Sequence, residues 1–346
     1  MAIPIIDMIL PLDDKSLSKE QTKVLENDKW FMIPLYLLFL CDFLTYFWTI
    51  YMLAEGSFES VFQKVIFLFS VTHLGTLGMS AGHELFHRKE FMHKLCGTLI
   101  YAKAMYAHFY IEHTKGHHKN VATPIDPVTA RQGESIYQYL PRCIFGSLKN
   151  VWKIESARLA RKPTPETPFS INNRMMWFVF KEAYLLFFAY YFNFEVMMLI
   201  IVYSALSIVL IEAVSYIEHY GLRRKSDENG VYEPISIMHS WDAPQQYTNY
   251  LLFKLQKHSD HHANSYKPYQ TLVCHKDAPT LPNGYTASLM TAFVPNVWFK
   301  VIDPLCTAAI EGKKLLELEK KESRDTMNSF LYTFYVLFTL ICFIAM

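Results

Sequence analysis

Long apolar runs alternate along the chain with polar stretches, and the length of each run limits what it can form. Runs of about 20 residues, the length that a helix needs to cross a bilayer, occupy residues 30–53, 61–82, 174–192 and 194–217, and a run of minimal length occupies 329–346. The pattern therefore predicts an all-α integral membrane protein with about five transmembrane helices.

Residues 95–112, with the sequence LCGTLIYAKAMYAHFYIE, form a further apolar stretch. Lys103 and His108 lie in its middle, and a charge at the centre of a bilayer costs roughly 2.5–3.5 kcal/mol on insertion scales. We therefore expect an interfacial helix over about 95–112 rather than a sixth crossing.

The stretches outside these runs complete the predicted domain organisation. Residues 1–29 contain DDKSLSKEQTK after a short apolar start, which does not match a signal peptide, so we expect a non-spanning lead-in. Residues 30–305 are predicted to form one membrane domain. The charged run EGKKLLELEKKESRD lies within a predicted linker over 306–328, ahead of the last helix.

The composition supports the membrane class and argues against other kinds of protein. Hydrophobic residues make up 51% of the chain and charged residues only 19%, which is unlike a pair of soluble domains. The 33 Lys and Arg residues balance 32 Asp and Glu residues, so no nucleic-acid partner is expected. The six cysteines form no C-x-x-C pair, which argues against a disulfide framework, a zinc ribbon or an iron–sulfur centre.

Histidine is the unusual residue: there are 14, and nine of them fall in four groups. On a helix, positions i and i+4 share a face with about 6 Å of rise between them, which suits two ligands of one metal ion. The groups are HELFH, EHTKGHHK, YIEHYGL and LQKHSDHH, and their histidines are His83, His87, His113, His117, His118, His219, His258, His261 and His262.

The first group also matches H-E-x-x-H, the pattern of zinc metalloproteases. A catalytic zinc takes three protein ligands and keeps one position open, whereas nine imidazoles are enough for two metal ions with four or five nitrogens each. The sequence therefore predicts a di-metal site. Because imidazole binds iron, copper, zinc and nickel alike, the ligands by themselves do not identify the metal.

An acidic residue stands beside a histidine in each group. Such neighbours often accept the ring N–H of a metal ligand and fix its tautomer. Simple solvation at a membrane face is an equally good explanation, and the sequence leaves both interpretations open. The four residues are Glu84, Glu112, Glu218 and Asp260.

Histidine groups that share one metal site must lie on the same side of the membrane. This condition predicts the membrane topology. The predicted helices at 174–192 and 194–217 form a hairpin that returns the chain to the side it left. The loops on the other side, about 54–60 and 193–194, contain no Lys or Arg, whereas the histidine-bearing side contains many. By the positive-inside rule, we expect a multi-pass protein whose metal site faces the cytosol or its organellar equivalent.

Several long strings resemble the membrane-bound alkane 1-monooxygenase family over roughly residues 5–305. They are HELFHR, FYIEHTKGHHKNVATPIDPVTARQGESIYQYLPR, YIEHYGL, LQKHSDHHANSYKPYQTL and LPNGYTASLMTAFVPNVWFKVIDP. The resemblance implies O2-dependent hydroxylation of the terminal carbon of an alkyl or fatty chain at a non-haem di-iron centre. It also implies that the nine grouped histidines hold the two irons, so that H-E-x-x-H is a fragment of this larger site.

The chain departs from the family pattern at both ends. Residues 1–29 resemble the stretch after the family's second span, so two N-terminal spans are expected to be absent, and 329–346 is expected to be an added helix. No fused rubredoxin is recognised, which implies an external rubredoxin- or ferredoxin-like donor with its reductase. We also expect membrane lipids and a membrane protein partner or larger complex around the chain.

The sequence is also compatible with other functions. A desaturase or fatty-acid hydroxylase carries similar histidine boxes, although VATPIDP and EHYGL favour the alkane hydroxylase. An enzyme-derived structural subunit of a membrane complex and an intramembrane protease are further alternatives. Tyr216, Tyr220 and Trp241 are candidates for the wall of a substrate channel, and the simpler interpretation is that they are ordinary interfacial aromatics.

Overall fold

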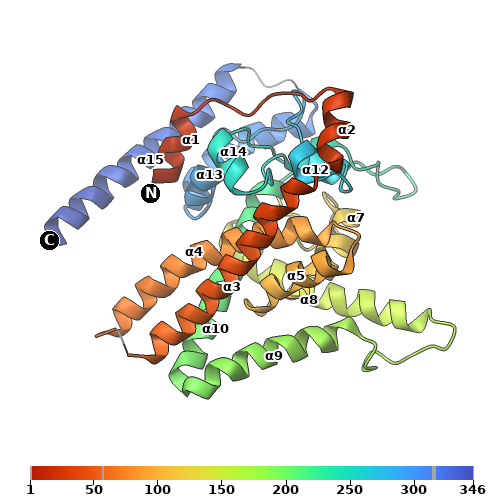
Figure 1. The fold of residues 1–346 in the computed structure, drawn as a ribbon. Coiled ribbons are helices and arrows are strands. Elements are labelled where there is room, and N and C mark those ends of the chain that lie inside the picture. The colour runs from red at the N-terminus through yellow and green to blue at the C-terminus, as the bar shows by residue number, and fades with distance from the viewer. Residues whose placement is uncertain (1, 57, 314–316, 346) are drawn as a thin grey trace. The chain divides into compact units, whose positions relative to one another are not determined.

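The computed structural model describes residues 2–56, 58–313 and 317–345, and its regular elements in these ranges are helices (Figure 1). The chain divides into two compact units. The span unit comprises residues 27–119 and 143–212. The terminal unit comprises the residues up to 26, residues 120–142 and the residues from 213 onward.

Most long helices contribute to the span unit, and two of them, α8 and α10, continue from one unit into the other. The elements are η1 Lys29–Phe31, α3 Met32–Ala54, α4 Val61–Phe86, α5 Phe91–Ala102, α6 Phe109–Ile111, the π-helix η2 Glu112–His117, α7 His118–Asn120, α8 Ile136–Ala160, α9 Arg174–Phe192 and α10 Phe194–His219.

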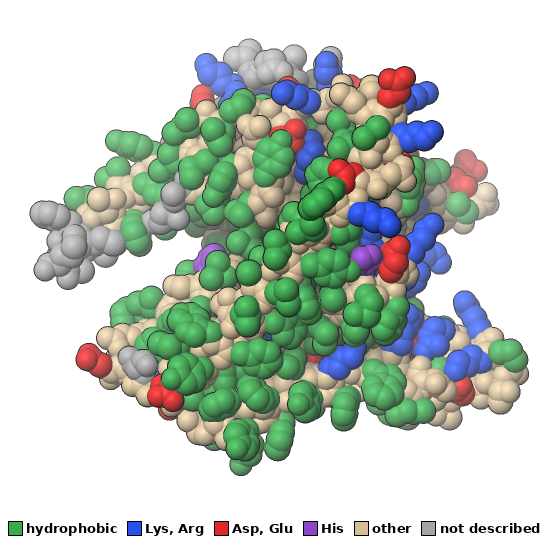
Figure 2. All heavy atoms as spheres, viewed as in Figure 1, with side chains coloured by type: hydrophobic (Ala, Val, Ile, Leu, Met, Phe, Trp, Pro, Cys, Tyr) green, Lys and Arg blue, Asp and Glu red, His purple; other side chains and the backbone are tan. Residues whose placement is uncertain are grey.

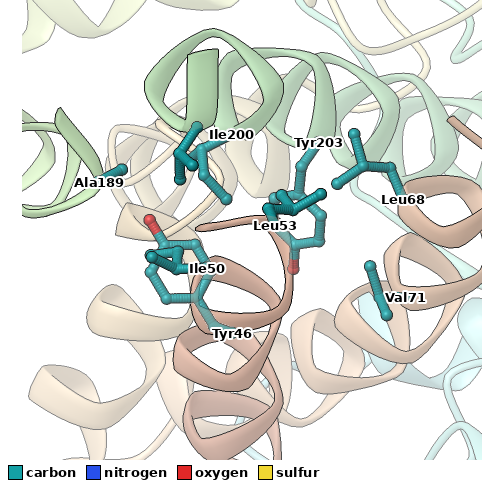
Figure 3. Close-up of a cluster of buried hydrophobic side chains, with 9 residues drawn as sticks. Tyr46, Ile50, Leu53, Leu68, Val71, Ala189, Ile200 and Tyr203 are labelled. Carbon is teal, nitrogen blue, oxygen red and sulfur yellow. The ribbon is translucent and has the colours of Figure 1, made fainter. Parts of the chain in front are cut away.

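The core of the span unit is apolar and joins four helices (Figure 3). Tyr46, Ile50 and Leu53 of α3 pack with Leu68 and Val71 of α4. The remaining members, from α9 and α10, are Ala189, Val196, Ile200 and Tyr203. The outward faces are apolar as well, and Figure 2 shows hydrophobic side chains gathered over α3, α4 and α9. Apolar residues on both the inner and the outer faces are what a lipid-embedded bundle requires.

Three helices are long and apolar enough to cross a membrane: Lys29–Ala54, Val61–Phe86 and Phe194–His219. They confirm three of the five predicted spans. The predicted span at 174–192 coincides with α9 but is not among the three, and its sequence includes Lys181 and Glu182. The predicted span at 329–346 lies in α15, and its side chains from residue 341 onward lie outside the described residues.

The predicted helix over 95–112 is interrupted. Helix α5 ends at Ala102, and Met105, in the following turn, has a φ of +52°. Lys103 is buried and paired: its Nζ lies 2.9 Å from Asp42 Oδ1 and donates a 2.8 Å hydrogen bond to Tyr203 Oη. Gly78 of α4 makes room for this pair, because a Cβ there would lie 2.5 Å from the Asp42 carboxyl carbon.

The terminal unit has shorter elements connected by ordered loops. They are α1 Ala2–Ile9, α2 Lys19–Asn27, η3 Ile237–His239, α11 Gln246–Leu251, α12 His258–Ala263, η4 Tyr269–Thr271, α13 Tyr285–Ala292, α14 Pro295–Ile310 and α15 Glu317–Ala345. Ala287, Val301, Met327 and Leu331 form a core between α13, α14 and α15. Helices α14 and α15 extend into the predicted linker over 306–328, and Met327 of this stretch is buried in that core.

Candidate metal centre

The histidines of the span unit converge at the buried end of α4. His83 lies in its last turn and His87 directly follows the helix. Ring nitrogens of His83, His87 and His113 all lie within 4.8 Å of one another. The Nε2 atoms of His87 and His113 are 3.0 Å apart, and those of His118 and His113 are 2.9 Å apart.

A π-helical turn sets the spacing of the second histidine group. Residues Glu112–His117 form this wider turn, which brings His118, five positions after His113, against the His113 ring. Gly116 permits a close contact inside the turn, because a Cβ there would lie 2.7 Å from Glu112 Oε1. The expected i, i+4 pairing of His113 with His117 is loosened, since their ring centroids are 5.6 Å apart. Single π turns of this kind are frequent at functional sites.

The terminal unit contains a second convergence of histidines. His219 is the last residue of α10, and His258 and His262 lie one turn apart on α12. The Nε2 atom of His258 lies 3.0 Å from Nε2 of His219 and 3.0 Å from Nε2 of His262. The His261 ring on the same helix is centred 5.6 Å from both His258 and His262.

The spacing of these nitrogens fits ligands of a common metal ion. A neutral imidazole carries one N–H and one lone pair, so several Nε2 atoms directed at one point do not satisfy one another fully. Two nitrogens that each lie about 2.1 Å from one ion are about 3.0 Å apart at a bond angle near 90°, and about 3.4 Å apart at a tetrahedral angle. The observed separations of 2.9–3.0 Å are therefore close to those expected for nitrogens that bind one metal ion.

Burial favours the neutral, metal-binding form of His87 and His113. It lowers the pKa of His87 to about 4. The pKa of His113 lies well below its usual value, first because of burial and then because other imidazoles surround it. Near neutral pH both rings offer a lone pair rather than a second proton.

The acidic neighbours are almost completely buried, so the interpretation that they are simply solvated is wrong. Glu84 pairs with Arg88, and both oxygens of Glu112 accept hydrogen bonds from Asn150 Nδ2, at 2.9 and 3.0 Å. Glu218 Oε2 lies 3.4 Å from His258 Nε2. The Asp260 carboxylate holds the loop after α12, and its partners there are Asn264, Lys267, Val273 and His275.

The three aromatic candidates for a channel wall are buried structural residues rather than interfacial ones. Trp241 Nε1 donates to the carbonyl of Tyr220 at 2.8 Å. The Tyr220 hydroxyl donates to Asp303 Oδ1 at 2.7 Å, and the Tyr216 hydroxyl donates to the carbonyl of Glu134 at 2.7 Å. Each therefore connects segments of the terminal unit close to His219.

Two supporting residues in the terminal unit carry no sequence signal of their own. The Oγ atom of Ser240 lies 3.5 Å from His219 Nδ1, and the Asp242 carboxylate binds Ser259, the residue after His258. The only sequence clue to Ser240 and Asp242 is that they flank Trp241, which the sequence suggests as a candidate wall residue.

The chain is similar to a known protein family and to named enzymes of other organisms. Residues 60–287 match the model of the family described as fatty acid desaturase. Alkane 1-monooxygenase 1 of Pseudomonas aeruginosa is 36% identical over 252 residues, which are 72% of this chain and 66% of the relative. The alkane 1-monooxygenase of Acinetobacter baylyi is 33% identical over 303 residues, or 87% and 73%. That of Pseudomonas putida is 32% identical over 330 residues, or 94% and 80%.

The chain spans about two thirds of the length of the Pseudomonas aeruginosa relatives, with 66% of the first and 64% of the second covered. Residues 60–287, which match the family model, contain all four histidine groups.

Proposed function

Because the chain belongs to the fatty acid desaturase family, we propose that it uses O2 to hydroxylate the terminal carbon of an alkyl or fatty chain at a histidine-bound di-iron centre. The observation that carries this proposal is the convergence of ring nitrogens in two separate groups, within 4.8 Å inside each. Alkane 1-monooxygenases are its relatives at 32–36% identity over most of the chain.

We propose that all nine grouped histidines are metal ligands. His83, His87, His113 and His118 supply one set of nitrogens, and His219, His258 and His262 supply the other. His117 and His261 lie beside these sets and complete the nine. When bound, two irons would supply the oxidation of an unactivated C–H bond, which no amino-acid side chain can perform.

The side chains have roles that follow from their surroundings. Burial keeps His87 and His113 neutral, and the buried carboxylates hold the segments that carry the histidines. The apolar helices of the span unit give an alkyl chain a water-free approach from the lipid, with the metal site on the positive-inside face of the membrane.

The overall reaction would convert R–CH3, O2, two electrons and two protons into R–CH2OH and water. The two electrons would come from an external rubredoxin- or ferredoxin-like protein with its reductase. A membrane protein partner or larger complex is part of the same proposal.

Product analysis tests this function. Iron-loaded protein would be supplied with O2, donor, reductase and alkyl chains of several lengths, and the products identified by mass spectrometry. A terminal alcohol is expected, and it should be absent with the His262→Ala variant. If an iron-replete protein leaves the alkyl substrate unchanged, the result would contradict the proposal and support a structural subunit.

A desaturase is the second candidate, because the matching family model carries that description. Both reactions begin with removal of hydrogen from an unactivated carbon and differ in the product. A carbon–carbon double bond without added oxygen, in place of the terminal alcohol, would identify this alternative.

A further inference from the structure

Helix α12 is too short to hold its own shape, yet it bears three of the nine grouped histidines. It spans six residues, His258–Ala263. Isolated helices shorter than about 12 residues are marginal in water, because helix nucleation is costly. Its N-cap residue, Lys257, makes no side-chain cap. Contacts from outside the helix must therefore fix the direction of its histidines.

Asp242 supplies the missing cap from a distant part of the chain. Its Oδ1 accepts a 2.7 Å hydrogen bond from the backbone N–H of Ser259, and its Oδ2 accepts a 2.8 Å bond from Ser259 Oγ. Ser259 is the second residue of α12, where the backbone N–H has no acceptor within the helix. Asp242 is 1% exposed, so water does not compete for these bonds.

The residues next to Asp242 bind the end of α10, which bears His219. The backbone N–H of Trp241 donates to the carbonyl of Glu218 at 2.9 Å, and its indole N–H donates to the carbonyl of Tyr220 at 2.8 Å. These two carbonyls lie immediately before and after His219. Residues 240–242 therefore form a bracket between the helix end that bears His219 and the helix that bears His258 and His262.

We infer that Asp242 is a positioning residue for the metal cluster of the terminal unit: it sets the His258 and His262 rings against the His219 ring. The inference rests on the proposed metal centre and not on hydroxylation. If Asp242 is truncated, Ser259 in the first turn of α12 loses both of its bonds to the Asp242 carboxylate, and the ring nitrogens of His219, His258 and His262 no longer converge on one point.

Asp7 offers a matched control in the same unit. Its carboxylate makes the same pair of bonds, to the backbone N–H of Thr248 at 3.1 Å and to Thr248 Oγ1 at 2.8 Å. Asp7 is 3% exposed, and the helix it supports, α11, has the sequence QYTNYL without histidine. Asp7→Ala therefore removes a comparable cap without touching a helix that bears ligands.

The test uses the full chain loaded with 57Fe, in wild-type, Asp242→Ala, Asp242→Asn, Ser259→Ala and Asp7→Ala forms. Iron content, Mössbauer spectrum and thermal midpoint are measured for each. We expect Asp242→Ala to lose about half of the iron or to change the quadrupole splitting of one of two iron signals. Asp242→Asn, which keeps an acceptor for the Ser259 N–H, and Ser259→Ala, which keeps one of the two bonds, should lie between it and wild type.

Asp7→Ala is expected to lower the thermal midpoint while it keeps wild-type iron content and spectrum. A wild-type spectrum and iron content in Asp242→Ala would overturn the inference, as would equal iron loss in Asp7→Ala. If Asp242→Ala does not fold, the spectra of Asp242→Asn and Ser259→Ala decide in the same way. Because none of these readouts needs turnover, an inactive wild-type protein with two irons would count against hydroxylation alone.

Discussion

His262 and His73 differ in surroundings although both are helical histidines. His262 is buried and its Nε2 lies 3.0 Å from that of His258, whereas His73 bonds the carbonyl of Phe69 in its own helix through Nδ1, at 2.7 Å. We expect about two irons per wild-type chain, about one or fewer in His262→Ala with loss of hydroxylation, and wild-type values in His73→Ala. Metal analysis and product assays check this, and a single stoichiometric zinc would rule out the di-iron centre.

Lys103 and Asp42 form a buried ion pair in the span unit, with 1% and 5% of their surfaces exposed. Removing one partner of such a pair costs about 3–5 kcal/mol, whereas replacing both by apolar residues is often neutral. Lys103→Met should therefore lower the free energy of unfolding by about that amount, and Asp42→Leu with Lys103→Met should recover most of it. Unfolding measurements in detergent would test the pair, and equal losses in the single and double variants would contradict this account.

The four histidine groups could be recognised from the sequence because spacing and resemblance are local properties of a sequence. Their supports could not, because the partners lie far apart along the chain. Asp242 binds Ser259 17 positions away, and Asn150 binds Glu112 38 positions away. The π turn was also missed, because an i, i+4 rule assumes a regular α-helix, while the geometry here depends on close contacts around Gly116.

Glu155 connects two helices, α8 and α9. Its buried carboxylate accepts hydrogen bonds from Arg158 Nη2 at 2.9 Å and from the Arg174 backbone N–H at 3.1 Å, and it pairs with the Arg174 guanidinium. Burial acts to raise the pKa of Glu155, but the hydrogen bonds from Arg174 and Arg158 outweigh it and lower that pKa to about 2. The contribution to stability is therefore present above about pH 4.5, the unfolded value, and is lost as the pH falls towards 2.

Glu155→Gln should therefore be less stable than wild type at pH 7, by about 1–3 kcal/mol for the lost charge-assisted bonds. It should also lose less stability than wild type between about pH 5 and pH 3. Thermal midpoints over this range check both statements, with the exposed Glu228→Gln as the control. Parallel pH curves for Glu155→Gln and wild type would show that another carboxylate dominates acid unfolding.

Helices α3, α4 and α10 could be predicted from the sequence because an apolar run of about 20 residues is by itself enough to indicate a membrane-spanning helix. The break after Ala102 could not, since it depends on Asp42 and Tyr203 receiving Lys103 from two other helices. Helix α15 begins inside the predicted linker, and its Met327 is buried against residues of α13 and α14. A charged residue such as Lys103 can therefore be buried when residues from other helices pair with it.

The topology of the whole molecule depends on how many times the chain crosses the membrane between His87 and His219. Helix α10 is one candidate crossing, so the histidine groups share one face only if there is a second, and α9 is the helix available. Its charged residues have partners: Glu182 Oε1 accepts the Ala107 N–H at 2.9 Å, and Lys181 Nζ lies 5.7 Å from the centre of the Phe178 ring. A paired polar group is tolerated at membrane depth.

We therefore expect α9 to cross the membrane and the turn at Asn193 to lie on the side opposite the histidines. Single cysteines at Glu90, Arg161 and Lys225 should react with an impermeant maleimide from one side of sealed vesicles, and cysteines at Glu59 and Asn193 from the other. The side that labels Lys225 should be cytosolic, because Arg223, Arg224 and Lys225 follow His219 directly. Labelling of Asn193 from the same side as Glu90 would leave α10 as an unpaired crossing. His219 would then lie on the opposite side of the membrane from His83 and His87, and the nine histidines could not form one di-iron centre.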